Sequence, residues 1–166
     1  MSTVVSARAV AAAVVDPEMP MLTLDDLGVL RDVRAAGDTV TVTITPTYSG
    51  CPALDAIRDD LRAALNQAGY PRVEVRTVLS PPWSTDWISE AGRAKLAEHG
   101  IAPPGRVGPR AAGPIPLTLD RPPARVACPR CGSYATEELS RFGPTACTAL
   151  HRCTACREPF EHVKEI

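Results

Sequence analysis

The chain has 166 residues, of which 45% are hydrophobic but only 4% aromatic, so Val, Leu, Ile and Ala must build its core. Its 18 Lys and Arg are balanced by 19 Asp and Glu. This balance excludes the strong basic footprint of a nucleic-acid binder, and no apolar run approaches the ~20 residues of a membrane-spanning helix, so neither nucleic acid nor a membrane is expected as a partner.

The N-terminal stretch predicts a helix rather than an export signal. Residues 3–15 are mostly Ala and Val and end at the turn "DPEMP". Alanine is a poor residue for the apolar core of a signal peptide, and Asp16 follows that run at once. We therefore expect a cytoplasmic protein whose cysteines are reduced, so that paired cysteines indicate metal binding or catalysis before disulfides.

The next elements alternate between strand and helix patterns. "VLRDVRA" and "TVTVTIT" have period-two alternation, and Gly37-Asp38 between them predicts a hairpin turn. Leu54, Ile57, Leu61, Leu65 and Ala68 recur at helical spacing, so a helix is expected up to Gly69. Residues 72–79 predict a third strand, and a further helix is expected from a cap at Ser84 or Thr85 to Gly100.

The second part of the chain has a different composition. From residue 100 to 123, 11 of 24 residues are Gly or Pro, which predicts an extended linker. We expect an α+β domain with a small three-stranded sheet at 1–99, a linker at 100–124 and a separate short unit at 125–166. That last unit is too small to fold by hydrophobic burial alone.

Four cysteines in two C-x-x-C pairs supply the missing stabilisation. The pairs are separated by 21 residues and predict one tetrahedral site of four thiolates, formed by Cys128, Cys131, Cys153 and Cys156. Zinc suits such a site, and rubredoxin-like iron is the smaller alternative. Because four protein ligands leave no open position, the metal is predicted to be structural.

Other metal-ligating side chains lie nearby. Cys147 and His151 fall between the two pairs and are alternative ligands, although we expect Cys147 to be a small buried residue. His99 and His162 are expected at the surface. Residues 125–166 carry six Lys and Arg against five acids, and the thiolate site adds negative charge, so this unit is predicted to contact protein and not nucleic acid.

One cysteine stands apart in "TPTYSGCP". If a helix begins at Pro52, Cys51 occupies its N-cap, where the helix dipole favours a thiolate. The position suits a thiolate that binds metal or attacks an electrophile, and equally a packing cysteine that merely caps the helix. No histidine is spaced to act as its base, so metal ligation, shared with Asp16, Glu18 or a second chain in a homodimer, is better supported than catalysis.

Two tryptophans lie within five residues in "PPWSTDW". Tryptophan is frequent among interface anchors, and neighbouring prolines stiffen the loop. We expect Trp83 to contact a partner, whereas Trp87 is expected to fill the core.

These blocks resemble a known family. The segments "DPEMPMLTLDDLGVLRDV", "TPTYSGCPA", "PPWSTDWIS" and "CPRCGS…FGPTACTALHRCTACREPF" together look like PaaD, the family of D subunits of bacterial phenylacetyl-CoA epoxidase. The first three also resemble small iron–sulfur assembly factors, including SufT. Relatives often end in a further cysteine, where this chain has Glu165.

The resemblance implies a non-enzymatic accessory role in the epoxidase system of aerobic phenylacetate degradation. It implies maturation of a partner subunit, such as the reductase, by insertion of iron or an Fe–S cluster. The residues carried over are Asp16, Pro17 and Glu18 in the turn, Cys51 in its loop and the four paired cysteines. The alternatives are a thiol-dependent enzyme using Cys51 and a zinc-ribbon nucleic-acid adaptor.

Overall fold

The computed structural model describes residues 6–109, 113 and 125–166. The chain divides into two compact units, Met1–Lys95 and Leu96–Ile166. The N-terminal unit contains α1 (Ala7–Ala12), β1 (Leu30–Ala36), β2 (Thr39–Ile44), α2 (Leu54–Gln67), β3 (Arg72–Thr77) and η1 (Thr85–Trp87). Then α3 (Glu90–Glu98) crosses the division, and the C-terminal unit contains β4 (Ile101–Ala102), β5 (Thr136–Ser140), β6 (Thr148–Cys153) and β7 (Pro159–Val163).

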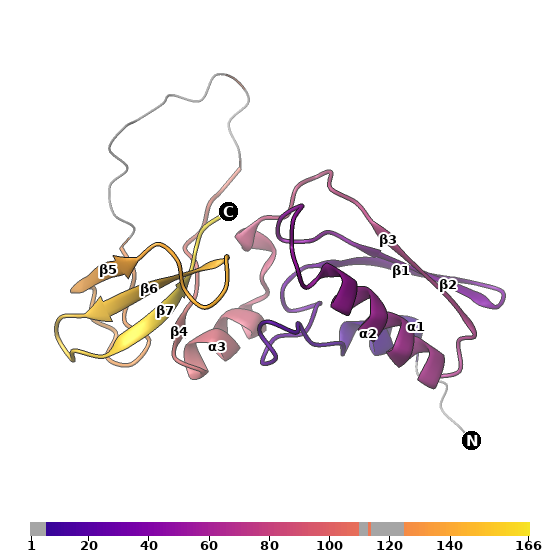
Figure 1. The fold of residues 1–166 in the computed structure, drawn as a ribbon, viewed down its shortest axis with the longest axis horizontal. Helices are drawn as coiled ribbons and strands as arrows, with labels where there is room; N and C mark the ends of the chain where they lie inside the picture. Colours follow the sequence, from indigo (N-terminus) through magenta and orange to yellow (C-terminus); the bar gives the residue numbers. More distant parts are fainter. Residues whose placement is uncertain (1–5, 110–112, 114–124) are drawn as a thin grey trace. The chain divides into compact units, whose positions relative to one another are not determined.

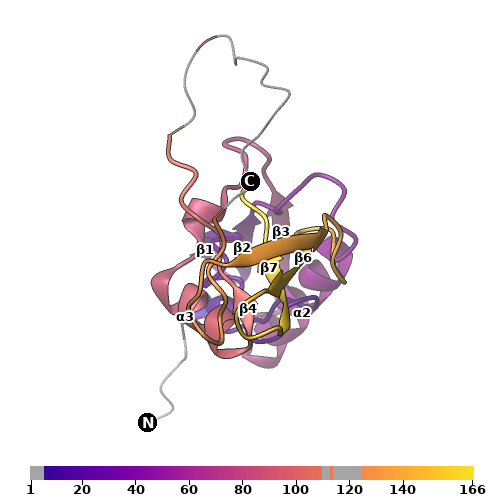
Figure 2. The same ribbon diagram turned by 90° about the vertical axis from the view of Figure 1, so that its left-hand side faces the viewer.

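The N-terminal sheet has the order β1-β2-β3, antiparallel between β1 and β2 and parallel between β2 and β3. Helices α1 and α2 lie on one face of it (Figures 1 and 2). The predicted alternation is confirmed, because the apolar residues of β2 are buried and its threonines are half-buried. Each fully buried Val, Leu or Ile side chain contributes roughly 1.5–3 kcal/mol. The buried residues of β2 and α2 are Val40, Val42, Ile44, Ile57, Leu61 and Leu65.

Several predicted boundaries differ from the structure. The first helix covers only Ala7–Ala12, capped by the Ser6 hydroxyl, and residues 1–5 lie outside the described part. The helix expected from Ser84 to Gly100 is two helices, because Ile88 between them is extended and buried. Ser89 begins the second: its N–H donates to the carbonyl of Asp26, and its hydroxyl accepts from the N–H of Gly92.

The C-terminal unit is a four-stranded sheet with the order β4-β7-β6-β5, in which only the β4–β7 pair is parallel. Strand β4 falls inside the segment expected as linker, so residues 101–102 belong to this sheet, whereas 110–112 and 114–124 lie outside the described residues. The α+β class, the three-stranded sheet with helices and the C-terminal ribbon are confirmed. One cluster of its core contains Ala102, Val126, Cys128, Cys153 and Phe160, and Cys147, Ala149 and Val163 are also buried.

Gly28 is a position where only glycine fits. Its φ is +69°, and a Cβ there would lie 2.6 Å from the Cβ of Trp87 and 2.7 Å from its carbonyl oxygen. Gly37, in the β1–β2 turn, also has positive φ (+58°) but open space around it. We expect Gly28→Ala to lower the free energy of unfolding by roughly 2–5 kcal/mol, and Gly37→Ala by only about 1–2 kcal/mol, because overpacking adds to the left-handed strain. Urea titration of both variants measures the difference, and equal losses would contradict the steric argument.

The residues that follow the two cysteine pairs share one backbone conformation. Gly132 has φ +72°, and Arg157 has φ +67°, the only positive φ among described non-glycine residues. We expect Arg157→Gly to stabilise the zinc-loaded protein by about 1 kcal/mol, because glycine relieves the Cβ clash of the left-handed region. Thermal unfolding at fixed zinc concentration tests this. Arg130→Gly is the matched control, since Arg130 lies inside the other cysteine pair without positive φ and should gain nothing.

Candidate functional site

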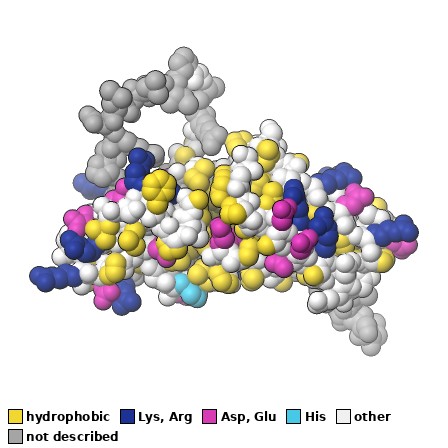
Figure 3. All heavy atoms as spheres, in the orientation of Figure 1, with side chains coloured by type: hydrophobic (Ala, Val, Ile, Leu, Met, Phe, Trp, Pro, Cys, Tyr) yellow, Lys and Arg dark blue, Asp and Glu magenta, His cyan; other side chains and the backbone are white. Residues whose placement is uncertain are grey.

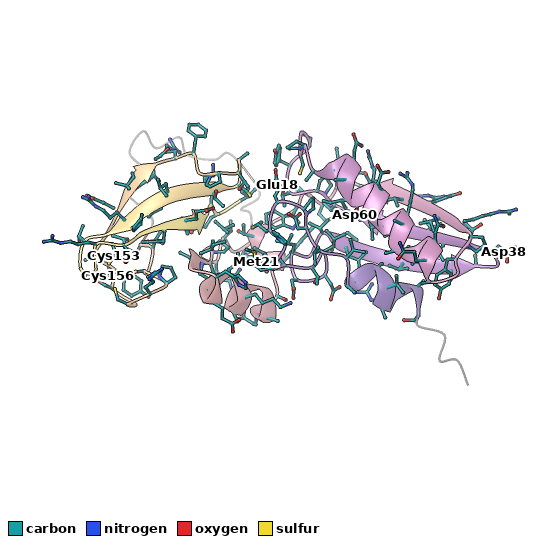
Figure 4. The ribbon with its side chains drawn as sticks, turned by 60° about the horizontal axis from the view of Figure 1, so that its bottom comes forward. Glu18, Met21, Asp38, Asp60, Cys153 and Cys156 are labelled. Carbon is teal, nitrogen blue, oxygen red and sulfur yellow. The ribbon has the colours of Figure 1, made fainter. Side chains whose placement is uncertain are left out.

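Four sulfurs converge at one end of the ribbon. The thiols of Cys128, Cys131, Cys153 and Cys156 all lie within 4.8 Å of one another. The closest approaches are 3.7 Å between Cys128 and Cys156 and 3.6 Å between Cys131 and Cys153. Sulfurs bound tetrahedrally to zinc at ~2.3 Å lie about 3.8 Å apart, so the quartet fits the ion. Figure 4 shows the Cys153 and Cys156 side chains close together.

The backbone of each cysteine pair is folded to aim both sulfurs at one point. The N–H of Gly132 donates to the carbonyl of Cys128 at 2.9 Å, which closes the first turn. In the second, the N–H of Cys156 points at the sulfur of Cys153, 3.5 Å away. Hydrogen bonding from the backbone of Cys156 lowers the pKa of the Cys153 thiol to about 7, whereas burial and the neighbouring sulfurs raise the pKa of the Cys156 thiol to about 12, so Cys153 is the sulfur that loses its proton first.

Cys147 and His151, the two alternative ligands, lie outside the four-cysteine cluster. Among the described residues, the metal-binding group contains those four cysteines and neither alternative. The expectation that Cys147 is a small buried residue is confirmed: it is 8% exposed, and its sulfur lies 3.1 Å from the hydroxyl of Thr145. His151 is buried against the rings of Phe160 and His162. Burial first, and then the neighbouring His162, lower the pKa of His151 and favour its neutral form.

The prediction of a surface position is wrong for His162, which is 4% exposed, whereas His99 is exposed. The Nε2 of His162 lies 3.4 Å from Oε1 of Glu165, which also accepts from the N–H of Gly105 at 3.0 Å. The hydrogen bond with His162 lowers the pKa of Glu165 to about 2. The Glu165 carboxylate therefore ties the C-terminal segment to β7 and to the loop at Gly105.

Cys51 is half-buried and lies in the loop between β2 and α2. The prediction that it caps α2 is wrong, because the N-cap is Ala53. The carbonyl of Cys51 accepts from the N–H of Leu54 at 3.2 Å, and its N–H donates to the carbonyl of Tyr48 at 3.3 Å, so the residue sits in a turn just before the helix. The residue is not deep in the core, and solvent reaches part of it.

The Asp16-Pro17-Glu18 turn separates its two carboxylates. Asp16 is 7% exposed, and its Oδ1 accepts from the N–H groups of Glu18 and Met19, both at 2.9 Å. This carboxylate therefore holds the turn together. Glu18 is exposed on the loop after α1 (Figure 4). Partial burial, and then the charge of Asp16, raise the pKa of Glu18.

Backbone hydrogen bonds bring this turn and the Cys51 loop to one end of the N-terminal sheet. Val15, in the segment after α1, bridges Thr23, and the carbonyl of Val29 accepts from the N–H of Thr45, the residue that opens the Cys51 loop. The segment after β3 joins them, because the N–H of Val78 donates to the carbonyl of Ile44. Figures 1 and 2 both show the loops after β2 and β3 at the same end of the sheet.

The burial of the two tryptophans is the reverse of the prediction, because Trp83 is more buried than Trp87. Trp83 is 4% exposed and its indole N–H donates to the carbonyl of Leu27 at 2.9 Å, so the predicted partner contact is corrected to a core position. Trp87, expected in the core, is half-buried, with the guanidinium of Arg31 stacked 3.8 Å from the ring centroid. Both belong to the N-terminal unit.

Sequence reasoning missed the exposed aromatic residues of the ribbon. Tyr134 is 67% exposed and Phe142 78% exposed, and they flank β5. A sequence feature could have identified them: both lie in short polar segments, in a chain that has few aromatic residues.

Charges of both signs are interspersed on the face of the molecule seen in Figure 3, with no broad basic area. This agrees with the balanced composition. None of the helices in the described ranges has the length and apolarity that crossing a bilayer requires.

Comparison with known proteins divides the chain in the same way. Residues 7–79 match the family model described as an iron–sulfur cluster assembly protein, and residues 113–164 match the PaaD zinc beta ribbon domain. A crystal structure of a domain of unknown function, DUF59, from Bacillus anthracis superimposes with a TM-score of 0.50 at 32% identity, covering 54% of this chain and 87% of that one.

Two relatives extend the comparison. The chain is 36% identical to an Fe-S protein maturation auxiliary factor of Porphyromonas gingivalis (strain ATCC BAA-308 / W83) over 50% of this chain and 80% of that protein. It is 43% identical to a protein of Escherichia coli (strain K12) that is named as the D subunit of 1,2-phenylacetyl-CoA epoxidase, over 90% of this chain and 85% of that protein. This likeness over most of both chains, together with the matching ribbon, places the chain in the PaaD family, the D subunits of phenylacetyl-CoA epoxidase.

Proposed function

We propose that the chain is an accessory subunit of a phenylacetyl-CoA epoxidase system and that it helps to insert iron or an Fe–S cluster into a partner subunit, the reductase being the best candidate. The observation that carries this proposal is a half-buried cysteine, Cys51, in a loop inside the segment that matches an iron–sulfur cluster assembly protein. The relative that spans most of this chain is named as an epoxidase subunit, which connects the assembly module to that system.

In this proposal the resident metal of the ribbon is structural zinc. Four thiolates complete a tetrahedral site and leave no position for water or substrate, so the zinc supplies only cross-linking. The two cysteine pairs belong to different turns of the ribbon, and the metal joins these turns. The chemistry of transfer must then occur elsewhere, on the N-terminal unit.

Cys51 is proposed to act on the iron that is the cargo. Its thiolate would donate one sulfur electron pair to iron or to a cluster, with the thiol proton passing to solvent, and thiolates of the recipient would then replace it by ligand exchange. A single protein thiolate holds iron weakly, which suits a transient carrier better than a storage site. The exposed carboxylate of Glu18, at the same end of the sheet, is the second donor that we assign to this step.

Two alternatives receive less support. A thiol-dependent enzyme needs a base near Cys51, but residues 7–79 contain no histidine. A nucleic-acid adaptor needs clustered cations, whereas residues 125–166 carry six Lys and Arg against five acids. The accessory role therefore remains the proposal, with protein subunits as partners and a homodimer as an additional arrangement that would complete a shared site.

Removal of one ribbon ligand should unfold the C-terminal unit. Cys153 is fully buried and contributes both a ligand and core volume, so Cys153→Ser should reduce bound zinc from about one ion per chain to a small fraction of that and expose the ribbon core. Metal analysis by inductively coupled plasma mass spectrometry and hydrogen exchange of residues 125–166 measure both effects. Cys147→Ser is the matched control, and it should retain zinc.

The role of Cys51 is tested by a variant that leaves the ribbon intact. Cys51→Ser should fold, keep its zinc, and leave the reductase with the low cluster content of cells that lack this protein, because the hydroxyl is a far weaker ligand for iron. Iron and acid-labile sulfide are measured in reductase purified from cells grown on another carbon source and exposed to phenylacetate. Normal cluster content in this strain would refute the transfer role, and Cys147→Ser again serves as the control.

A further inference from the structure

Strand β5 lies at the outer edge of the ribbon sheet. It pairs with β6 on one side, and no described strand pairs with it on the other. The carbonyl of Ala135 accepts from the N–H of Thr154, so the alternation of antiparallel pairing turns the backbone groups of Glu138 away from β6. Such an edge is a template for one more strand.

Apolar side chains accompany this edge. Tyr134 precedes β5, Leu139 lies at its bulge and Phe142 follows it, with exposed fractions of 67%, 49% and 78%. Aromatic residues make up only 4% of the chain, yet two of them are exposed to solvent at the two ends of one strand. Large exposed aromatic side chains beside a sheet edge are typical of the anchors of a protein interface.

The charge of the edge limits what can bind there. Glu137 is neutralised by Arg152, whose Nε donates to its Oε1 at 2.9 Å. Glu138 is exposed and forms no ion pair within the described residues. If a second copy paired through its own β5 with Glu138 opposite Glu138, like charges would meet, and acidic residues on an edge oppose such self-association. A strand that brings a basic residue would instead complement Glu138.

We infer that the β5 edge, defined as Tyr134, Thr136–Ser140 and Phe142, is the docking surface for an extended segment of a partner protein. The segment adds to the sheet as a fifth strand, places a Lys or Arg opposite Glu138 and covers Phe142 and Leu139 with apolar side chains. The inference rests on the proposed function for the identity of the partner, a protein component of the epoxidase system. It replaces Trp83, which is buried, as the source of partner contacts.

The test uses the full chain and each purified component of the epoxidase system as the probe. We expect at least one component to bind and to slow amide hydrogen exchange across residues 136–140. Phe142→Ala should weaken that binding about tenfold. Glu138→Lys should weaken it at least as much, and added salt should then strengthen the remaining binding, because salt screens the repulsion between the lysine and the basic residue. Leu79→Ala is the matched control, since Leu79 is 56% exposed but belongs to the N-terminal unit, and it should bind as the unmodified chain does.

Three outcomes overturn the inference. These are binding by none of the components, binding that leaves residues 136–140 unprotected and is indifferent to Phe142→Ala, and a dimer of this chain that itself protects those amides. The proposed function is decided separately, by the cluster content of the reductase in cells carrying Cys51→Ser. A normal cluster content there, with Phe142→Ala still weakening binding, would keep the docking surface and remove the transfer role.

Discussion

The convergence of four sulfurs on one point is the constraint on which the C-terminal unit depends. Its core cluster has five members, and two of them, Cys128 and Cys153, are ligands of the metal site. A core of this size buries too little apolar surface to offset the conformational entropy of the unit, roughly 1–2 kcal/mol per residue for the backbone alone. We therefore expect metal binding to supply part of the folding free energy of this unit.

In the N-terminal unit, a hydrophobic core offsets the conformational entropy of folding. Its sheet is covered by α1 and α2, and aliphatic residues of β2 and α2 are fully buried between them. Cys51 lies outside this core, in a loop held by turn hydrogen bonds from neighbouring backbone. In the proposal the two kinds of cysteine differ by coordination: four thiolates that saturate a metal are inert, whereas Cys51, outside that site, exchanges ligands.

The features predicted correctly from sequence are those that depend on local periodicity or fixed spacing. Alternation in "TVTVTIT" and the helical repeat from Leu54 to Leu65 reflect burial on one face, so they located β2 and α2. The two C-x-x-C pairs identified the metal site because the turn geometry is encoded within four residues. Family resemblance supplied what spacing could not, namely the iron–sulfur context.

The failures concern side chains whose environment is set by distant segments. Trp83 is buried because the carbonyl of Leu27, 56 positions earlier, accepts its indole proton. His162 is buried because β7 is central in its sheet, between β4 and β6. Cys51 misses the N-cap by two residues because Leu54 closes a preceding turn onto it. None of these contacts leaves a pattern in the local sequence. The hydrogen bond between Thr45, before the Cys51 loop, and Val29, before β1, likewise joins segments that periodicity does not connect.

The four-cysteine site has no open position for another ligand, whereas β5 has an unpaired edge. In the proposal the ribbon therefore binds a partner protein but takes no part in the transfer of iron. In the proposal, zinc joins the β6–β7 turn, which carries Cys153 and Cys156, to the turn of Cys128 and Cys131 just before β5, and β5 pairs along β6 at the outside of the sheet. Rigidity lowers the entropic cost of adding a strand, because the template is already ordered before the partner arrives. The acidic residues of β5 then act against self-pairing, and the exposed aromatic residues supply the contact area. Phe142 is 78% exposed and Tyr134 67% exposed, so neither ring contributes much buried apolar area to the fold, although the ammonium of Lys164 lies 5.5 Å from the Phe142 ring centroid; binding of a partner therefore accounts better for their position.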